Sequence, residues 1–200
     1  MKPVVLSLQG CMATGKTTAV QYLQIQEPRI SVSFESNRHV IEEVKRRKLD
    51  KNQYEDYLEI QKLWLKNKIA RYEEAITHPV SIMDFGAEEI EFYTLNYPKS
   101  MGKNWEIASA LKSELEAVRA CMPARILFLD ASEETVRAHK EADSTRSREF
   151  FEYYLKHLMP LKKAWFRERK DTDWFCVDGL TAEDVGEQVK KWVSLLVVFL

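Results

Sequence analysis

The sequence has few of the residues on which disulfide-rich, zinc-binding or low-complexity proteins depend. It contains 3 cysteines, Cys11, Cys121 and Cys176, which are far apart and show no CxxC spacing. This pattern argues against structural zinc and predicts a reducing compartment. The 6 glycines and 6 prolines among 200 residues exclude collagenous and low-complexity classes, and 11% aromatic residues argue against disorder.

An excess of one charge and a long hydrophobic run are also missing. The 30 basic residues (Lys and Arg) against 31 acidic ones leave a net charge of −1, which argues against binding to nucleic acid polymers. No signal peptide opens the chain. The apolar run Trp192–Leu200 is too short to cross a bilayer, which leaves a packed last element, an oligomer contact or a membrane-surface contact. We therefore expect a cytoplasmic protein with no membrane partner.

A hydrophobic content of 45% can build one sizeable core, so we expect a single domain over residues 1–200. Short apolar runs alternate with segments of helical periodicity. The expected strands are 4–8, 30–34, 80–84, 125–129 and 174–177. The expected helices are 17–26, 38–48, 54–76, 87–95, 105–121, one capped by Asp130 and Glu133, 150–167, and a last one capped by Thr181 and Asp184. The polar segment Lys140–Glu149 is predicted to be a loop.

Five strands separated by helices require crossover connections, which predict an α/β fold with a parallel sheet and helices on both faces. Ligands of such sheets bind outside the carboxyl ends of the strands. At these ends the sequence places Gly10, Glu35, Asp84, Asp130 and Asp178. We therefore expect the chemistry at that edge.

The segment Gly10–Thr17 fits GxxxxGK[ST], follows a predicted strand and opens a predicted helix. The glycines let the backbone wrap a phosphate, the loop amides donate to its oxygens, Lys16 neutralises the terminal phosphates and Thr17 ligates magnesium. The alternative is a glycine-rich turn with a solvated lysine. The nucleotide-binding residues predicted by the motif are Gly10, Cys11, Met12, Ala13, Thr14, Gly15, Lys16, Thr17 and Thr18.

Four places in the sequence carry a family resemblance: GKTT at Gly15–Thr18, the acids Glu35 and Asp84, and the segment Thr145–Glu149 before an aromatic-rich helix. With these residues the chain resembles the P-loop kinases of the thymidylate kinase and deoxynucleoside kinase group. The resemblance covers most of the chain and implies a five-stranded parallel sheet, ATP as phosphoryl donor and a mobile lid at about residues 140–150. It also implies that the loop after the fifth strand approaches the adenine.

The two acids fit a kinase on chemical grounds, because transfer to a neutral hydroxyl needs a base near the acceptor and an acid near the metal. Glu35 is the candidate base, a role that the resemblance also implies, and Asp84 is the candidate group for Mg²⁺. The alternatives are a solvated carboxylate that caps the next helix for Glu35 and an N-cap for Asp84.

Arg146 and Arg148, with Lys140 and Arg137 upstream, are candidates for spreading charge off the transferring phosphoryl group. The alternative is that Arg137 pairs along its helix and that the other arginines are ordinary loop charges. The run Lys45–Lys48 similarly fits either an anionic acceptor or a solvated helix face.

The chain departs from the kinase pattern at two points. An arginine usually follows the acid after the third strand, whereas Phe85 follows Asp84 here. Either Arg38 or another residue replaces this cation, or the acceptor is not a standard nucleoside or nucleotide. The second departure is the interior of the P-loop, which lacks the extra glycine common in these families.

The expected function is an ATP-dependent kinase that transfers the γ-phosphoryl group of Mg-ATP to a nucleoside, nucleotide or related hydroxyl-bearing acceptor. The alternative is a P-loop NTPase or a nucleotide-binding regulator that acts on a protein partner. No [NT]KxD or LSGGQ-like segment supports a GTPase or a transporter ATPase. The aromatic stripe of helix 54–76 fits core packing or an acceptor wall, and its apolar face and the tail 195–200 fit either a homodimer surface or an ordinary core.

Overall fold

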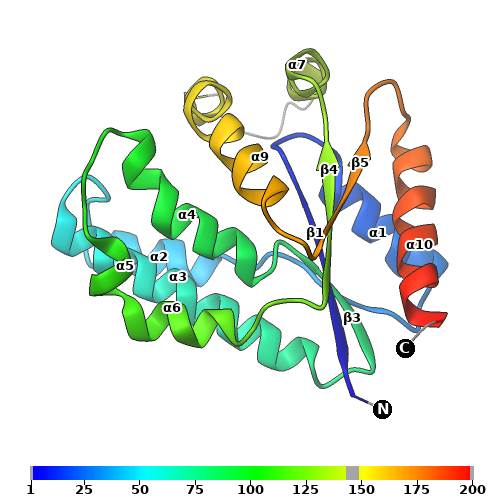
Figure 1. Cartoon of the computed structure of the whole chain (residues 1–200), viewed down its shortest axis with the longest axis horizontal. Helices are drawn as coiled ribbons and strands as arrows, with labels where there is room; N and C mark the ends of the chain where they lie inside the picture. Colours follow the sequence, from blue (N-terminus) through cyan, green and yellow to red (C-terminus); the bar gives the residue numbers. More distant parts are fainter. Residues whose placement is uncertain (1, 143–148, 199–200) are drawn as a thin grey trace.

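The computed structural model describes residues 2–142 and 149–198 (Figure 1). Its strands are β1 (Val4–Gly10), β2 (Ser31–Ser33), β3 (Val80–Asp84), β4 (Arg125–Asp130) and β5 (Thr172–Cys176). Its helices are α1 (Lys16–Gln26), α2 (Arg38–Arg46), α3 (Tyr54–Ala75), α4 (Ala87–Ser100), α5 (Ile107–Ala110), α6 (Lys112–Arg119), α7 (Glu133–Ala142), α8 (Glu149–Tyr153), the π-helix η1 (Tyr154–Leu158), α9 (Met159–Arg167) and α10 (Ala182–Val198).

The five strands form one parallel sheet in the order β2-β3-β1-β4-β5. β1 lies at its centre, where Leu8 aligns with Asp84 of β3 and with Leu127 of β4. Helices cover both faces, with α1 and α10 on one side and α3, α4 and α6 on the other (Figure 1). The predicted α/β architecture is therefore confirmed.

The sheet and the helices next to it enclose the larger hydrophobic core. Strand residues such as Leu6, Leu8 and Phe128 are fully buried because helices cover both faces of the sheet. α1 and α10 pack against each other on one face, and Val189 and Val193 of α10 join the same core. This core fixes the centre of the sheet, from which the P-loop emerges.

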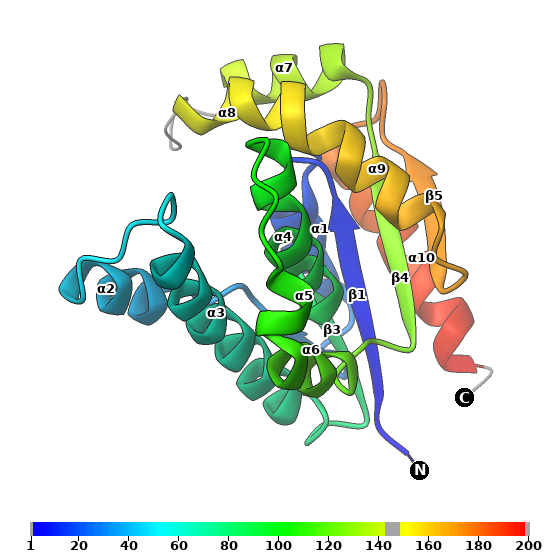
Figure 2. The same ribbon diagram turned by 60° about the vertical axis from the view of Figure 1, so that its left-hand side comes forward.

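A second, smaller core lies among α3, α4, α5 and α6. Tyr57 is its largest buried aromatic residue and stacks on Tyr97 with ring centroids 6.3 Å apart. The aromatic stripe of α3 is therefore core packing. Figure 2 shows α2 and α3 reaching away from the sheet, with α5 and α6 beside α3.

Two helices differ from the sequence-based expectation. α4 continues through Pro98 to Ser100 instead of stopping before the proline. Pro98 has no N–H to donate to the carbonyl of Thr94, and the hydroxyl of Tyr57 donates to that carbonyl at 3.0 Å instead. The expected helix 105–121 is broken into α5 and α6 at Leu111, whose backbone leaves helical geometry while its side chain is fully buried.

The predicted loop over residues 140–149 is wrong at both ends. α7 continues through Ala142 because its last turns consist mostly of good helix formers, and α8 already includes Glu149. Residues 143–148 lie outside the described part of the chain. Of the described helices, none has the length and apolar character needed to cross a membrane.

The predicted cap at Asp130 is also wrong. Asp130 is the last residue of β4, and its carboxylate pairs with Lys163 of α9 at 2.6 Å. The hydroxyl of Ser132 caps α7 instead and accepts the amide proton of Thr135 at 3.2 Å. The predicted cap of α10 is confirmed. The carboxylate of Asp184 accepts from the amide of Thr181 at 3.0 Å, and the amide of Asp184 donates to the hydroxyl of Thr181 at 3.2 Å.

Candidate active site

The P-loop connects the carboxyl end of β1 to the first turn of α1. A Cβ atom on Gly10 would lie 2.5 Å from the carbonyl oxygen of Leu129 on β4, so only glycine fits there. Gly15 precedes α1 with a left-handed φ of 80°. Ala13 adopts a similar φ of 59° without being a glycine, which places local strain in the loop.

Three side chains from distant helices hold the backbone of the P-loop. Lys162 of α9 donates to the carbonyl of Gly10 at 3.0 Å, and His139 of α7 lies 2.8 Å from the carbonyl of Ala13 through Nδ1. The hydroxyl of Tyr154 accepts the amide proton of Met12 at 3.3 Å, at the point where the helix widens into its π turn. Such turns are frequent at functional sites.

Lys16 is nearly enclosed, with 6% of its surface exposed. Its ammonium group donates to the carbonyl of Cys11 and to the hydroxyl of Thr14, and it lies 4.8 Å from the centre of the Phe85 ring. Burial, with the nearby charge of Lys162 as the next cause, lowers its pKa to about 8. The negative charge of a bound triphosphate would compensate the positive charge of this lysine.

Thr17 and Asp84 meet at the entrance of α1. The hydroxyl of Thr17 donates to Oδ2 of Asp84 at 2.9 Å. The other carboxylate oxygen of Asp84 is buried and has no hydrogen-bond partner among the described residues, and burial raises the pKa of this group. A hydroxyl beside an unpartnered carboxylate oxygen is the ligand set that Mg²⁺ accepts, so these two residues fit a magnesium ion bound with a nucleotide.

A pair of buried cations on α3 supports the turn after β3. Lys68 and Arg71 both donate to the carbonyl of Phe85 at 3.0 Å. Arg71 also donates to the carbonyls of Ser33 at 2.6 Å and Asp84 at 3.0 Å. Arg71 therefore ties the ends of β2 and β3 together.

Glu35 follows β2 and faces the same turn. Its carboxylate lies 4.0 Å from the ammonium group of Lys68. Burial lowers the pKa of Lys68 to about 8, with the neighbouring charge of Arg71 as the next cause. Glu35 is more exposed than its partner and lines the cavity described below.

Glu89 on α4 is a second carboxylate at this end of the site. It pairs with the ammonium group of Lys162 at 2.6 Å. Burial raises the pKa of Glu89, and the charge of Lys162 acts in the opposite direction. Phe85 has a left-handed φ of 60°, and its ring lies 5.1 Å from the ammonium group of Lys162 and near that of Lys16. The position where the kinases carry arginine thus presents an aromatic ring to two lysines.

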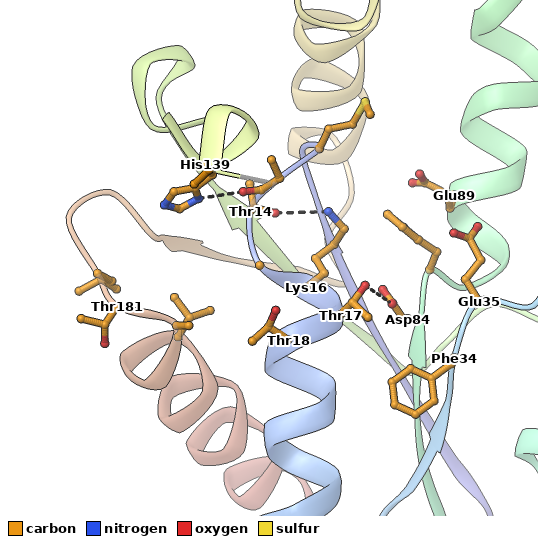
Figure 3. Close-up of a pocket in the computed structure, with 18 of the residues that line it drawn as sticks. Thr14, Lys16, Thr17, Thr18, Phe34, Glu35, Asp84, Glu89, His139 and Thr181 are labelled. Carbon is orange, nitrogen blue, oxygen red and sulfur yellow. Dashed lines mark hydrogen bonds between the residues drawn. The ribbon is translucent and has the colours of Figure 1, made fainter. Parts of the chain in front are cut away.

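One cavity of about 850 Å³ joins these groups. Figure 3 shows the P-loop in its middle, with His139 and Thr181 on one side and Glu35, Glu89 and Phe34 on the other. The loop after β5 contributes to the wall through Leu180–Ala182. The full lining is Met12–Thr18, Phe34, Glu35, Asp84, Phe85, Glu89, Tyr93, His139, Ala142, Phe150, Leu180–Ala182 and Val185.

The structure brings together Lys16, Thr17, Glu35 and Asp84, as the sequence predicts. Arg38 does not replace the missing arginine, because its side chain is 91% exposed and pairs with Glu42 at 2.8 Å. Asp130 and Asp178 do not line the cavity. Asp178 instead accepts the amide proton of Ser132 at 2.9 Å.

The predicted basic residues include some that pair with glutamates on the surface and two that lie outside the described part of the chain. Arg137 pairs with Glu133 and Glu152 on the surface, so its alternative as an ordinary helix charge is the one that the structure supports. In the run Lys45–Lys48, Arg46 and Arg47 likewise pair with the glutamates of α2 and α3. Arg146 and Arg148 lie outside the described residues, so their role stays a prediction.

Four charged side chains that line or support the candidate site were missed from the sequence: Lys68, Arg71, Glu89 and Lys162. A signal for two of them exists in the helical period of α3, because Lys68 and Arg71 follow Leu65 at steps of three residues and precede the buried Ala75. Charged residues in the phase of a buried stripe indicate an internal partner. No comparable local signal marks Glu89, whose ion-pair partner lies 73 residues along the chain.

The sequence model of a family described as AAA domain matches residues 5–173. No curated protein matches the sequence. Among solved structures, a deoxyadenosine kinase from M. mycoides, with the products dCMP and a flexible dCDP bound, is similar with a TM-score of 0.74 and 15% identity over 96% of this chain and 99% of that one.

A thymidylate kinase from Candida albicans is similar with a TM-score of 0.67 and 11% identity, covering 97% of this chain and 92% of that one. Its description adds a broad substrate specificity and a novel structural element. At these identities the similarity of both structures concerns the fold, so the chemistry has to be argued from the site itself.

Proposed function

Because this chain belongs to the AAA domain family of P-loop NTPases, we propose that it is an ATP-dependent kinase for a small hydroxyl-bearing acceptor, with a nucleoside favoured. The observation that carries the proposal is one continuous cavity with the P-loop in its middle (Figure 3). We call the side of His139 and Thr181 the donor compartment and the side of Glu35, Glu89 and Phe34 the acceptor compartment. One compartment offers the loop after β5 to the nucleotide base. The other offers Glu35 and aromatic side chains to an acceptor.

We assign each residue of the site a separate role in phosphoryl transfer. Lys16 and the P-loop amides hold the β- and γ-phosphates. Thr17 and Asp84 would hold Mg²⁺, which neutralises phosphate oxygens when bound. Glu35 takes the proton of the acceptor hydroxyl while the acceptor oxygen bonds to the γ-phosphorus and the bond to the bridging oxygen breaks. The products are the phosphorylated acceptor and ADP.

The fold similarity to a deoxyadenosine kinase and a thymidylate kinase is consistent with this proposal. Between a hydroxyl acceptor and a monophosphate acceptor, the site favours the hydroxyl. A monophosphate is already anionic and needs cations, whereas Glu35 supplies a base and Phe85 replaces an arginine.

The test is ADP formation from Mg-ATP across a panel of nucleosides, nucleoside monophosphates and small alcohols, with Lys16→Ala as the inactive control. We expect one class of acceptor to stimulate ADP release and Lys16→Ala to abolish it. If ATP raises the melting temperature but no acceptor stimulates turnover, the kinase proposal is wrong. Hydrolysis stimulated by a protein partner would then favour a P-loop NTPase.

A further inference from the structure

Three cations next to the acceptor compartment are buried and bind the protein itself, whereas the exposed Lys51 lies 5.7 Å from the centre of the Phe150 ring and does not line the cavity. Lys68, Arg71 and Lys162 are only 2%, 6% and 1% exposed. Lys68 and Arg71 donate to backbone carbonyls of the turn after β3, and Lys162 donates to the carbonyl of Gly10. None of the three lines the cavity. They stabilise the walls, so within residues 2–142 and 149–198 none of these three cations presents its charged group to a ligand in the cavity.

The carboxylates of Glu35 and Glu89, in contrast to these buried cations, line the cavity. Lys162 pairs with one oxygen of Glu89, and Lys68 lies near Glu35, while both carboxylates line the cavity. Figure 3 shows them on the same side of the P-loop. Each pair therefore keeps its positive end inside the protein and presents its negative end to a ligand.

The remaining wall of the compartment is aromatic, formed by Phe34, Phe85, Tyr93 and Phe150. Among the described residues of the lining, Lys16 is the only lysine or arginine, and the P-loop motif assigns it to the donor phosphates. Carboxylates and aromatic faces attract hydrogen-bond donors and positive charge and repel anions.

We propose that Glu89 is a specificity-determining residue: with Glu35 it selects an acceptor that carries hydroxyl or amino donors and no negative charge, and it rejects phosphorylated acceptors. This inference rests on the proposed kinase function and narrows its substrate class. It assigns a role to the ion pair of Glu89 and Lys162, which the transfer step itself does not use.

The experiment compares the binding of nucleosides with that of their 5′-monophosphates. Thymidine, deoxyadenosine, cytidine and adenosine are titrated against their monophosphates by calorimetry, with the donor site saturated by a non-hydrolysable ATP analogue and Mg²⁺. We expect the wild-type protein to bind at least one nucleoside more tightly than its monophosphate by a factor of about ten or more. One repulsive contact between charges has an effect of this size.

Two variants test the role of Glu89. Glu89→Gln leaves the positive charge of Lys162 without its carboxylate partner behind the wall of the compartment, whereas Glu89→Gln with Lys162→Met removes both charges. Affinity for the monophosphate is expected to be highest in the single variant, intermediate in the double variant and lowest in the wild type. The double variant also covers the case in which an unpaired buried lysine prevents the single variant from folding.

Glu91→Gln is the matched control, because Glu91 lies two residues along on α4, is similarly buried and pairs with Arg119 away from the cavity. It should keep the wild-type preference. Tighter binding of monophosphates by the wild type, or an unchanged preference in both folded Glu89 variants, would overturn this inference and leave the kinase proposal standing. Binding of neither class would overturn this inference, and the panel of acceptors in the ADP-release assay would then decide the kinase proposal.

Discussion

The donor and acceptor sides of the cavity are built in different ways. On the donor side, nine consecutive residues, Gly10–Thr18, form the P-loop and the first turn of α1. On the acceptor side, the wall comes from residues after β2, after β3, on α4 and on α8. Cations on α3 donate to its backbone, and Lys162 on α9 pairs with its Glu89. A contiguous motif brings its own binding groups together along the chain, although distant helices support its backbone. A dispersed wall has its groups brought together only by the fold.

The largest effect is expected from a substitution of Asp84, because this residue contacts both the donor side and the support of the acceptor side. Its carboxylate accepts from Thr17, and its carbonyl accepts from Arg71. Asp84→Asn keeps the shape and the hydrogen-bond acceptor but removes the negative charge. We expect turnover to fall on the order of 10³-fold and Mg²⁺ no longer to tighten ATP binding.

This prediction is checked by ADP release and by ATP titrations with and without Mg²⁺. Because burial raises the pKa of Asp84, the neutral amide should not lower the melting temperature. A folded variant with wild-type turnover would remove Asp84 from the proposed metal site.

Glu35→Gln should separate the two sides, because it alters the acceptor compartment alone. Loss of the base is expected to lower turnover by about 10² while ATP affinity stays the same. The measurements are steady-state kinetics and an ATP titration on the same sample. Glu42→Gln, on the exposed face of α2, is the control and should leave both quantities unchanged. Equal turnover in the two variants would show that Glu35 is not the base.

Arg71→Met tests whether the acceptor wall depends on its buried support. The carbonyls of Ser33 and Asp84 lose their side-chain donor, while that of Phe85 keeps Lys68, so we expect the free energy of unfolding to fall by about 3 kcal/mol. Urea denaturation measures this change. Arg46→Met, which breaks an exposed pair with Glu43, should hardly move the midpoint. If the two variants have the same midpoint, Arg71 does not hold the ends of β2 and β3 together.

The smallest expected effect concerns pH and the donor side alone. Lys16 has a pKa of about 8 in the free protein, and only its charged form neutralises a triphosphate. ATP affinity should therefore be constant below pH 8 and fall by at most tenfold for each pH unit above it. Lys68→Met is the control, because Lys68 also has a pKa of about 8 but does not line the cavity. It should keep this dependence, and Lys16→Met should lose it.

The lowered pKa of Lys16 also makes the free energy of unfolding depend on pH. In the unfolded chain Lys16 returns to the ordinary lysine pKa of 10.5, so between pH 8 and 10.5 the unfolded state binds more protons than the folded one. Unfolding free energy from this group therefore rises with pH across that window and is lowest below pH 8. Denaturation of the nucleotide-free protein at pH 7 and pH 9.5 measures it, and Lys16→Met should reduce the rise but leave the part that Lys68 contributes.

The fold could be predicted from the sequence because each strand is a short apolar run with helical periodicity on either side. The errors arose where distant residues decide the local structure. The hydroxyl of Tyr57 supplies the donor that Pro98 lacks, and Lys163 takes the carboxylate of Asp130 away from the start of α7. Neither partner lies near its target in the sequence.

The candidate site follows the same rule. The P-loop could be predicted because spacing alone specifies it, and Glu35 and Asp84 could be placed because strand ends meet at one edge of a parallel sheet. Lys162 could not, because it approaches the carbonyl of Gly10 from a helix 152 residues further along. Charge pairs that form only in the folded protein leave no spacing pattern in the sequence.

Phe85 limits how this site can have evolved. Its ring lies about 5 Å from the ammonium groups of both Lys16 and Lys162. A single change of Phe85 to arginine, which would restore the kinase pattern, would place a third cation beside these two lysines. A viable path between the two arrangements therefore requires a second substitution, at Lys162 or its partner Glu89. The residue after Asp84 and the ion pair on α4 and α9 are thus expected to be epistatic, and they would change together along a lineage.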